Sequence, residues 1–302
     1  FQPQLYQLIM LPRSGQISYD QIRAEFGNPN NFSLKEALDL RYGDLNRFSY
    51  IQPINNGRDY KPSDFYGYTS SKVVNDSLVL HWDAWPTMGS HSGSGTAITD
   101  LSSVRTRGEM YNGSYWDSKN GGNFVFDGMD DYIVSEARDT FNNYADKITV
   151  DFWVKWDSPM NYGQGVGQGV LNNQDRVRDG NIWLMHGNLG SNTVTFYVWT
   201  SRGLVSGGSS STLSTGTWYN LVCTMDSQGS QFYTNGQQSG TGGNTGGAII
   251  NNRDASIFAG GDLRYEWRRM AGAISALKVY NKKLTSSEVT QNYNALVGRL
   301  DQ

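Results

Sequence analysis

Large apolar side chains recur at every second residue from Ile148 to Trp156. Successive side chains of a β-strand point to opposite faces, so this period places the apolar set on one buried face. The same period recurs from Val194 to Trp199. Short strands of this kind, separated by turn residues, predict an antiparallel sandwich or barrel. Further strands are predicted from Leu78 onward, at 218–225, 232–234 and 273–280.

Turn residues separate the predicted strands. Asn235-Gly236 follows the strand that ends at Thr234 and is the strongest short hairpin signal in the chain. Gly/Ser/Thr-rich stretches at 203–216 and 239–247 predict loops or weak strands. The 302 residues include 35 glycines, 18 tyrosines and 9 tryptophans, and only 18% of them are charged. This composition favours an all-β protein with many tight turns.

Composition also excludes several kinds of stabilisation and partner. Cys223 is the only cysteine, so no internal disulfide can form, and we expect it to be a small buried side chain. The net charge of −3 favours neither nucleic acid nor an anionic membrane as a partner. No apolar run approaches the ~20 residues that span a bilayer. The first residues lack the pattern of a secretory signal peptide.

A helix is predicted near the C-terminus. Thr285 and Glu288 stand three residues apart, as the two partners of a capping box do. An apolar stripe follows, and Gly298 is predicted to end the helix. The stripe consists of Val289, Tyr293, Leu296 and Val297.

Residues 1–70 have a different pattern. Ser18 and Ser33 each precede a Gln or Glu by three residues, which predicts two capped helix starts. Helices this short do not persist alone in water, so we expect them to pack on a partner. We predict that 1–70 is an anchoring segment and that 71–302 is the sandwich with its C-terminal helix. The predicted partner-anchoring residues are Ile17, Ile22, Phe26, Leu34, Leu38, Phe65 and Tyr66.

Several segments resemble laminin-G-like, concanavalin A-like domains. Gly121–Ile133 resembles their hairpin, Ile148–Trp156 their long aromatic strand, and Val279–Leu296 their closing strand and helix. These segments follow one another in the order that the family has. The resemblance implies a mainly β fold, an antiparallel two-sheet jelly-roll sandwich, preceded here by a small segment of short helices and loops.

The form of this domain that ends in an Asn-Tyr-Asn-Ala helix is common in bacteriophage virion proteins. Residues 11–18 and 63–67 also resemble the N-terminal segments of such proteins. The resemblance implies a structural protein on the outer surface of the virion: a capsid decoration, head fibre or tail appendage. Its expected partners are other virion proteins and a host-surface glycan, and we expect it to be oligomeric on the particle. The alternative is a secreted or cell-surface lectin-like protein.

We expect no catalytic activity. Some relatives of this fold hydrolyse polysaccharides with two carboxylates that lie on one strand. None of the glutamates lies in an alternating acidic strand; they occur at positions 25, 36, 109, 136, 266 and 288. The histidines His81, His91 and His186 lack the spacing of a zinc site, and we expect His81 to be a packing residue. A polysaccharide hydrolase is therefore the least favoured function.

A glycan site needs an aromatic platform beside hydrogen-bonding side chains. The segment from Arg264 to Arg269 is unusually aromatic and charged for a loop. The alternative is that such rings cover the edges of the sandwich. The predicted residues for binding a glycan or a partner are Tyr115, Trp116, Tyr162, Tyr265, Trp267 and Arg268, with Tyr111, Asn172 and Asn173 as further candidates.

Asp127, Asp130 and Asp131 cluster at a predicted turn. Many laminin-G domains bind calcium, and carboxylate oxygens are ligands that calcium prefers. Calcium is therefore the one cofactor that the sequence suggests. The alternative, which we favour, is that these aspartates only form the hairpin turn.

Overall fold

The structure is a computed structural model of the chain. It describes residues 73–86, 89–119, 121–136, 144–159, 164–171, 177–188, 190–250, 255–261 and 268–300. The short helices predicted within residues 1–70 lie outside these residues. The contacts divide the chain into one unit of Asn75–Val289 with Gln302 and a second unit of Phe1–Val74 with Thr290–Asp301. The predicted boundary between residues 70 and 71 stays a prediction.

Two antiparallel sheets of eight strands each form a sandwich in the described part of the chain. The first of them, sheet I, joins strands that are far apart in the sequence. Its strands are β1 (Leu78–Asp83), β4 (Tyr115–Asp117), β5 (Asn123–Asp127), β7 (Ile148–Trp156), β12 (Tyr219–Asp226), β13 (Gly229–Thr234), β14 (Gln237–Gly242) and β16 (Ala271–Tyr280). Their order is β14-β13-β12-β7-β16-β5-β4, and β1 pairs with β16.

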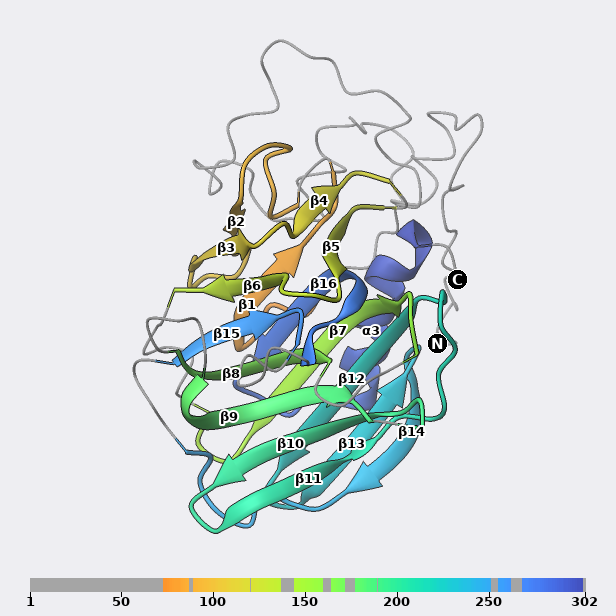
Figure 1. The fold of residues 1–302 in the computed structure, drawn as a ribbon. Coiled ribbons are helices and arrows are strands. Elements are labelled where there is room, and N and C mark those ends of the chain that lie inside the picture. Colours follow the sequence, from red (N-terminus) through yellow and green to blue (C-terminus); the bar gives the residue numbers. More distant parts are fainter. Residues whose placement is uncertain are drawn as a thin grey trace, which may run out of the picture. The chain divides into compact units, whose positions relative to one another are not determined.

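Sheet II lies in front of sheet I in Figure 1. Its order is β11-β10-β9-β8-β15-β6-β3-β2. The two stacked antiparallel sheets confirm the predicted fold class. The strands of sheet II are β2 (Ala97–Thr99), β3 (Arg107–Tyr111), β6 (Tyr132–Ser135), β8 (Gly165–Leu171), β9 (Val177–Gly187), β10 (Val194–Thr200), β11 (Gly203–Ser209) and β15 (Ala255–Ala259).

The alternation of side chains along β7 decides which of them enter the core. Phe152, Val154 and Trp156 belong to the main hydrophobic cluster and have no exposed surface. Full burial of one large apolar side chain contributes about 1.5–3 kcal/mol. Asp151 and Trp153 point to the opposite face and are fully buried as well. Both faces of β7 are therefore covered.

Sheets I and II approach each other along β11 and β14, and glycines permit this approach. A Cβ atom on Gly242 would lie 2.4 Å from the backbone of Gly207 and Gly208. The amide of Gly243 donates a hydrogen bond to Ser206 O at 3.1 Å. The Gly/Ser/Thr-rich stretches therefore include true strands, because residues without bulky side chains let the two sheet edges meet.

Three local predictions are confirmed. Asn235 and Gly236 connect β13 to β14 with φ angles of 51° and 75°, the left-handed pair that a tight two-residue hairpin turn requires. Cys223 is fully buried in β12, and burial raises the pKa of its thiol. His81 is 5% exposed, and its Nε2 lies 3.7 Å from Asp83 Oδ2.

Helix α3 (Ser286–Leu296) begins with the predicted capping box. The Glu288 amide donates to Thr285 Oγ1 at 3.3 Å, and the Thr285 amide donates to Glu288 Oε2 at 2.8 Å. The predicted end of the helix is wrong: the α-helix ends before Gly298, and the 3₁₀ turn η5 (Val297–Arg299) runs through that glycine. Such turns are frequent at helix ends. No helix within the described ranges is both long and apolar enough to cross a membrane.

Glu288 also joins an ion-pair network at the start of α3. Lys282 Nζ lies 2.7 Å from Glu288 Oε1 and 2.7 Å from Asp76 Oδ2. Burial alone would raise the pKa of Glu288, but hydrogen bonds from Lys282 and Thr285 hold that pKa below its ordinary value of 4.5. A carboxyl group with a lowered pKa stabilises the fold above its unfolded pKa, and this contribution is lost as the pH falls.

We expect Glu288→Gln to lower the free energy of unfolding by about 0.5–1 kcal/mol at neutral pH, because the ion pair with Lys282 is lost while the Gln side-chain oxygen can still accept the bond from the Thr285 amide. The free energy of unfolding of the variant should also change less with pH below 4.5, where the wild type loses the stability that Glu288 contributes. Urea titrations of both proteins at neutral and acidic pH measure the two effects. An equal loss of stability on acidification in both proteins would contradict this assignment.

Candidate functional site

Two turns that cross between the sheets contact each other: the β3–β4 turn leads from sheet II to sheet I, and the β5–β6 turn leads from sheet I to sheet II. The hairpin expected at Gly121–Ile133 is therefore wrong, because β5 pairs with β4 and β16, whereas β6 pairs with β3 and β15. The β3–β4 turn contacts the β5–β6 turn because the Asn112 side chain donates to Asp130 O at 3.1 Å. Next to it, Ser114 Oγ donates to Tyr132 O at 3.1 Å. Hydrogen bonds to backbone oxygens thus hold the two crossover turns together.

The bases of two longer connections reach the same place. A Cβ atom on Gly260 would lie 2.9 Å from Asp131 O, so the chain that leaves β15 passes directly against the β5–β6 turn. The Gln164 side chain, just before β8, donates to Arg269 O at 2.9 Å. Segments from four connections therefore converge around Asp131.

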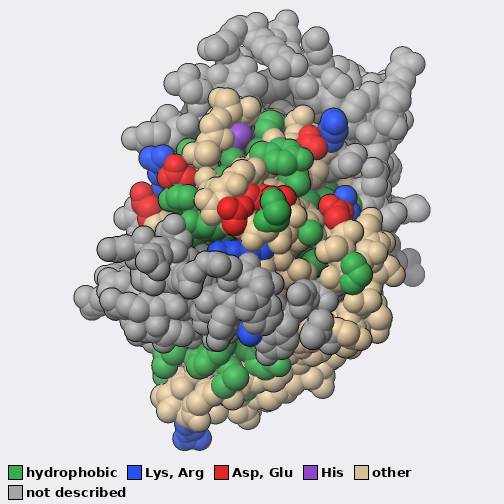
Figure 2. Space-filling model, viewed as in Figure 1, with side chains coloured by type: hydrophobic (Ala, Val, Ile, Leu, Met, Phe, Trp, Pro, Cys, Tyr) green, Lys and Arg blue, Asp and Glu red, His purple; other side chains and the backbone are tan. Residues whose placement is uncertain are grey.

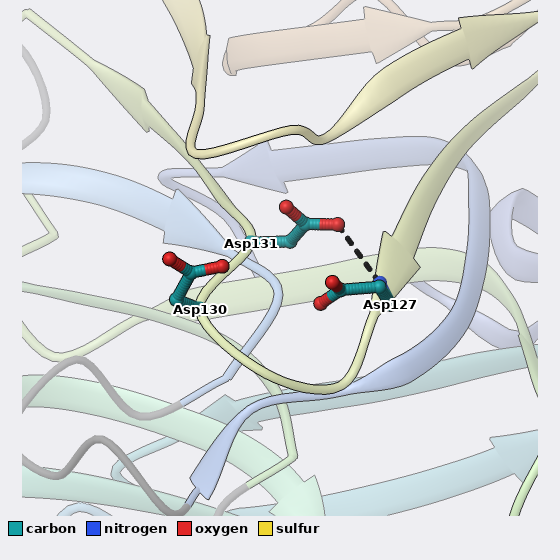
Figure 3. Close-up of side chains that lie close together, drawn as sticks. All are labelled: Asp127, Asp130 and Asp131. Atoms are coloured by element: carbon teal, nitrogen blue, oxygen red, sulfur yellow. Dashed lines mark hydrogen bonds between the residues drawn. The ribbon is translucent and has the colours of Figure 1, made fainter.

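The β5–β6 turn brings three carboxylates together (Figure 3). Asp127, Asp130 and Asp131 each offer an oxygen, and these oxygens lie within 4.8 Å of one another. Asp131 Oδ2 accepts a hydrogen bond from the Asp127 amide at 2.8 Å. Asp127 Oδ1 accepts one from the Met129 amide at 2.7 Å. Two of the carboxylates thus stabilise the turn, which is the structural role favoured from the sequence.

A stack of aromatic and cationic groups lies beside these carboxylates. The rings of Tyr111 and Tyr132 are 4.9 Å apart and nearly parallel, with an angle of 9° between their planes. The Arg269 guanidinium lies 5.2 Å from the centre of the Tyr132 ring. Tyr132 is buried, whereas Tyr111 is 37% exposed. Tyr111 therefore presents a supported ring at the surface.

We call the exposed part of this region the hairpin surface. Met129 at the tip of the β5–β6 turn is 70% exposed, and the carboxylates of Asp127 and Asp130 are exposed beside it. Acidic and hydrophobic side chains lie side by side on the face of the molecule that Figure 2 shows. The hairpin surface consists of Tyr111, Asn112, Asp127, Met129 and Asp130.

The electrostatics of the turn fit a hard cation. Burial raises the pKa of Asp131, and the negative charges of Asp127 and Asp130 raise it further. Asp131 Oδ1 is buried and has no hydrogen-bond partner in the described part of the chain. A divalent cation would relieve the repulsion among the three carboxylates, and calcium prefers carboxylate oxygens as ligands.

Calcium at this turn stays a prediction. We expect calcium to raise the thermal midpoint of the full chain and magnesium to raise it less, because magnesium demands a near-ideal octahedral geometry and gives up its water reluctantly. Asp130→Asn should remove the effect of calcium, since this carboxylate forms none of the hydrogen bonds of the turn described above. Thermal scans with each ion, together with direct metal analysis, test this. If metal analysis finds almost no bound calcium, the calcium site is ruled out and the three aspartates serve only to form the turn.

The structure places some of the predicted ligand-binding residues near the hairpin surface. Tyr115 is 54% exposed on β4, opposite Val125. Trp116 donates from Nε1 to Ala84 O at 2.7 Å and stacks on His91 with 5.0 Å between ring centres. That arrangement matches the alternative role of covering an edge. Arg268 is partly buried where the chain returns toward β16.

Other predicted residues lie outside the described residues. These are Tyr162, Tyr265, Trp267, Asn172 and Asn173, as well as the anchoring residues Ile17, Ile22, Phe26, Leu34, Leu38, Phe65 and Tyr66. The flanks of two of their loops are described, at Gln164 and at Arg269, and a hydrogen bond joins them.

Sequence reasoning missed two contributors to this region, Tyr132 and Asn112, and included Arg269 only as the end of the segment from Arg264 to Arg269. Tyr132 and Arg269 support Tyr111 from below, and Asn112 ties the two turns together. Tyr132 was missed because its position in the sequence is that of an ordinary strand residue. Asn112 carried a weak signal: Asn112-Gly113 is a turn dipeptide, and Asn112 has a φ of 62°.

Comparisons with known structures agree on the fold. The binding domain of botulinum neurotoxin DC in complex with SialylT aligns with a TM-score of 0.55 at 14% identity, over 74% of this chain and 52% of that one. Domain 4 of AbnA, a GH43 extracellular arabinanase from Geobacillus stearothermophilus, in complex with arabinotriose, aligns with a TM-score of 0.52 at 17% identity, over 73% of this chain and 100% of that one.

Larger proteins share the fold over part of their length. A Trypanosoma rangeli sialidase in complex with the inhibitor DANA aligns with a TM-score of 0.51 at 17% identity, over 74% of this chain and 33% of the sialidase. The aligned part of this chain thus corresponds to about a third of that enzyme. Identities this low show the fold alone. A comparison with curated proteins found no significant match.

A family model identifies the chain more directly. The model of the concanavalin A-like lectin/glucanases superfamily matches residues 126–290, more than half of the chain. The match includes most of the β5–β6 turn, the long strand β7 and the start of α3. This chain belongs to the concanavalin A-like lectin/glucanases superfamily.

Proposed function

We propose that the hairpin surface binds carbohydrate and that the chain displays this surface on a bacteriophage particle. The observation that carries the first part is the exposed ring of Tyr111, which is held parallel to Tyr132 beside two exposed carboxylates. The apolar face of a sugar ring packs on such an aromatic platform. Its hydroxyl groups donate to acceptors such as Asp127 and Asp130.

The fold supports this proposal without identifying the sugar. The neurotoxin binding domain is in complex with SialylT, and the arabinanase domain is in complex with arabinotriose. Two proteins with this sandwich thus bind glycans, at 14% and 17% identity to the present chain. The ligand of this chain follows from its own surface, which offers one aromatic face, an apolar tip at Met129 and acidic acceptors.

We further propose that the chain is a binding protein and not a glycosidase. A retaining glycosidase needs two carboxyl groups about 5 Å apart that both reach the scissile bond. Asp131 is only 2% exposed, and its Oδ2 is occupied by the Asp127 amide. The raised pKa of Asp131 therefore reflects its burial in the turn and is not a sign of a catalytic acid. Release of reducing sugar from polysaccharides that the chain binds would overturn this part of the proposal.

We expect Tyr111→Ala to weaken glycan binding about tenfold or more, because it removes the stacking platform. Tyr111→Phe keeps the ring and should retain most of the affinity. Leu204→Ala is a control at another exposed apolar position, 54% exposed on β11. A glycan array followed by calorimetry on the full chain measures these effects. Binding that survives Tyr111→Ala unchanged would place the glycan elsewhere.

The virion role rests on the resemblance of residues 1–70 to phage anchoring segments. We expect the full chain to cosediment with virus particles that were prepared without this protein. The double variant Phe26→Asp with Leu38→Asp should not cosediment, because it removes two of the predicted anchoring side chains. Leu204→Asp is the matched control outside that segment. A chain that binds glycan but never sediments with particles would favour the secreted or cell-surface lectin instead.

A further inference from the structure

A polar cavity lies where four other connections meet, and no residue of the hairpin surface lines it. It has a volume of about 440 Å³, within the range of ligand pockets of roughly 300–1,000 Å³. Asp146 precedes β7, Arg202 lies in the β10–β11 turn, and Ser227 lies in the β12–β13 turn. The segment that follows β14 completes the lining with Asn244, Thr245, Gly246, Gly247 and Ala248.

Backbone hydrogen bonds hold the walls of this cavity in place. The Thr245 amide donates to Asp226 O at 3.0 Å, which ties the segment to sheet I. The Ser201 amide donates to Ala248 O at 2.8 Å, which ties the same segment to sheet II. The cavity therefore lies between the ends of both sheets on a fixed frame, and a ligand would not have to order it.

The wall near Arg202 is shaped by the absence of side chains. A Cβ atom on Gly247 would lie 2.5 Å from Ser201 Oγ and 3.3 Å from Arg202 Cγ. Gly246 has a φ of 61° and lies next to the same arginine side chain. These two glycines thus let the stem of Arg202 pack against bare backbone.

Several donors at the cavity lack acceptors. In the described part of the chain, the amides of Gly246, Gly247 and Ala248 form no hydrogen bond. Thr245 is fully buried, and its Oγ1 has no partner there either. Consecutive free amides and an arginine that line one cavity can together bind an anionic oxygen.

The two charged side chains of the cavity do not neutralise each other. Neither Asp146 nor Arg202 forms a side-chain hydrogen bond or ion pair with any residue in the ranges that the structure describes. An anion would pair with Arg202, and hydroxyl groups would donate to Asp146. Among the described residues, the lining has no aromatic or large apolar side chain, so its chemistry favours a charged, polar ligand over a neutral, stacked one.

We infer that this cavity is a second binding site, specific for a carboxylated sugar residue such as a uronic acid. The carboxylate pairs with Arg202 and the free amides around Gly246 and Gly247. The ring hydroxyls donate to Asp146 and hydrogen-bond with Asn244 and Ser227. This site goes beyond the proposed function, because it uses none of the residues of the hairpin surface.

The test compares galacturonic acid with galactose, which has the same ring and lacks the carboxylate. Saturation-transfer NMR and calorimetry on the full chain should detect binding of the acid at millimolar concentration and at least tenfold weaker binding of galactose. Arg202→Gln should weaken binding of the acid by about tenfold to a hundredfold. Arg107→Gln makes the same change of charge at an exposed position on β3 and should have no effect.

Two further measurements separate this site from the hairpin surface. Tyr111→Ala should leave binding of galacturonic acid unchanged, whatever its effect on other glycans. Thermal scans confirm that each variant is folded. The inference is overturned if the acid does not bind, if it binds no better than galactose, or if Tyr111→Ala removes its binding while Arg202→Gln does not.

Discussion

Replacing Lys278 with methionine is expected to lower the free energy of unfolding by about 3–5 kcal/mol. Lys278 Nζ lies 3.2 Å from Asp151 Oδ2, and both side chains are fully buried. Asn220 Nδ2 donates to Asp151 Oδ1 at 2.8 Å. Methionine is one atom shorter than lysine and fills nearly the same space, but the substitution takes the cation away from a carboxylate that remains buried. The loss of stability therefore reflects the desolvated charge and not lost packing.

Urea titrations of the full chain measure this loss. Lys155→Met is the matched control, because Lys155 forms a more exposed ion pair, at 3.3 Å from Asp157, and should cost about 1 kcal/mol or less. The double variant Asp151→Asn with Lys278→Met removes both charges and should regain much of the stability. Similar losses for Lys278→Met and Lys155→Met would mean that the buried pair does not hold full charges.

Replacing Gly122 with alanine is expected to cost about 3 kcal/mol or more, from backbone strain and a steric clash together. Gly122 has a φ of 88°, and a Cβ atom there would lie 1.8 Å from Ala84 O. Ala84 O is the acceptor for Trp116 Nε1, and Ser275 Oγ donates to Gly122 O at 2.8 Å. A methyl group on residue 122 would therefore push away the backbone of Ala84, through which the end of β1 contacts the β4–β5 hairpin.

Gly216→Ala separates the two contributions. Gly216 has a φ of 73°, and a Cβ atom there would meet nothing within 4 Å. Gly216→Ala should therefore lower the free energy of unfolding by about 1 kcal/mol, from backbone strain alone. The difference between the two variants in urea titrations gives the cost of the clash with Ala84. If both variants lose the same stability, the backbone around residue 122 moves to accept the methyl group at no measurable cost.

The two proposed binding sites place different demands on a ligand. The hairpin surface offers the Tyr111 ring and exposed carboxylates, which suits the apolar face and hydroxyls of a sugar. The cavity around Arg202 offers a cation and free amides, which suits an acid. A glycan with neutral and acidic residues would use both kinds of contact, and each contact can be removed by one substitution.

The sequence by itself determined the strands and turns that depend on local interactions. The period of two between Ile148 and Trp156 follows from the pleat of a strand, and the full length of β7 matches it. Asn235-Gly236 and the capping box at Thr285 also act within a few residues. The glycine-rich stretches were predicted only as loops or weak strands, and the strands β8, β9 and β15 escaped prediction, since pairing stabilises these strands more than their own composition does.

Only the tertiary structure decided which residues form the sites. Tyr111, Tyr132 and Arg269 lie on separate elements, and the order of strands in sheet II brings them together. Arg202 and Thr245 line one cavity because the segment after β14 is bound to both sheets. Contacts of this kind depend on the pairing of distant strands, which no local pattern encodes. The sequence could therefore name candidate aromatic and acidic residues, while the fold selected those that act together.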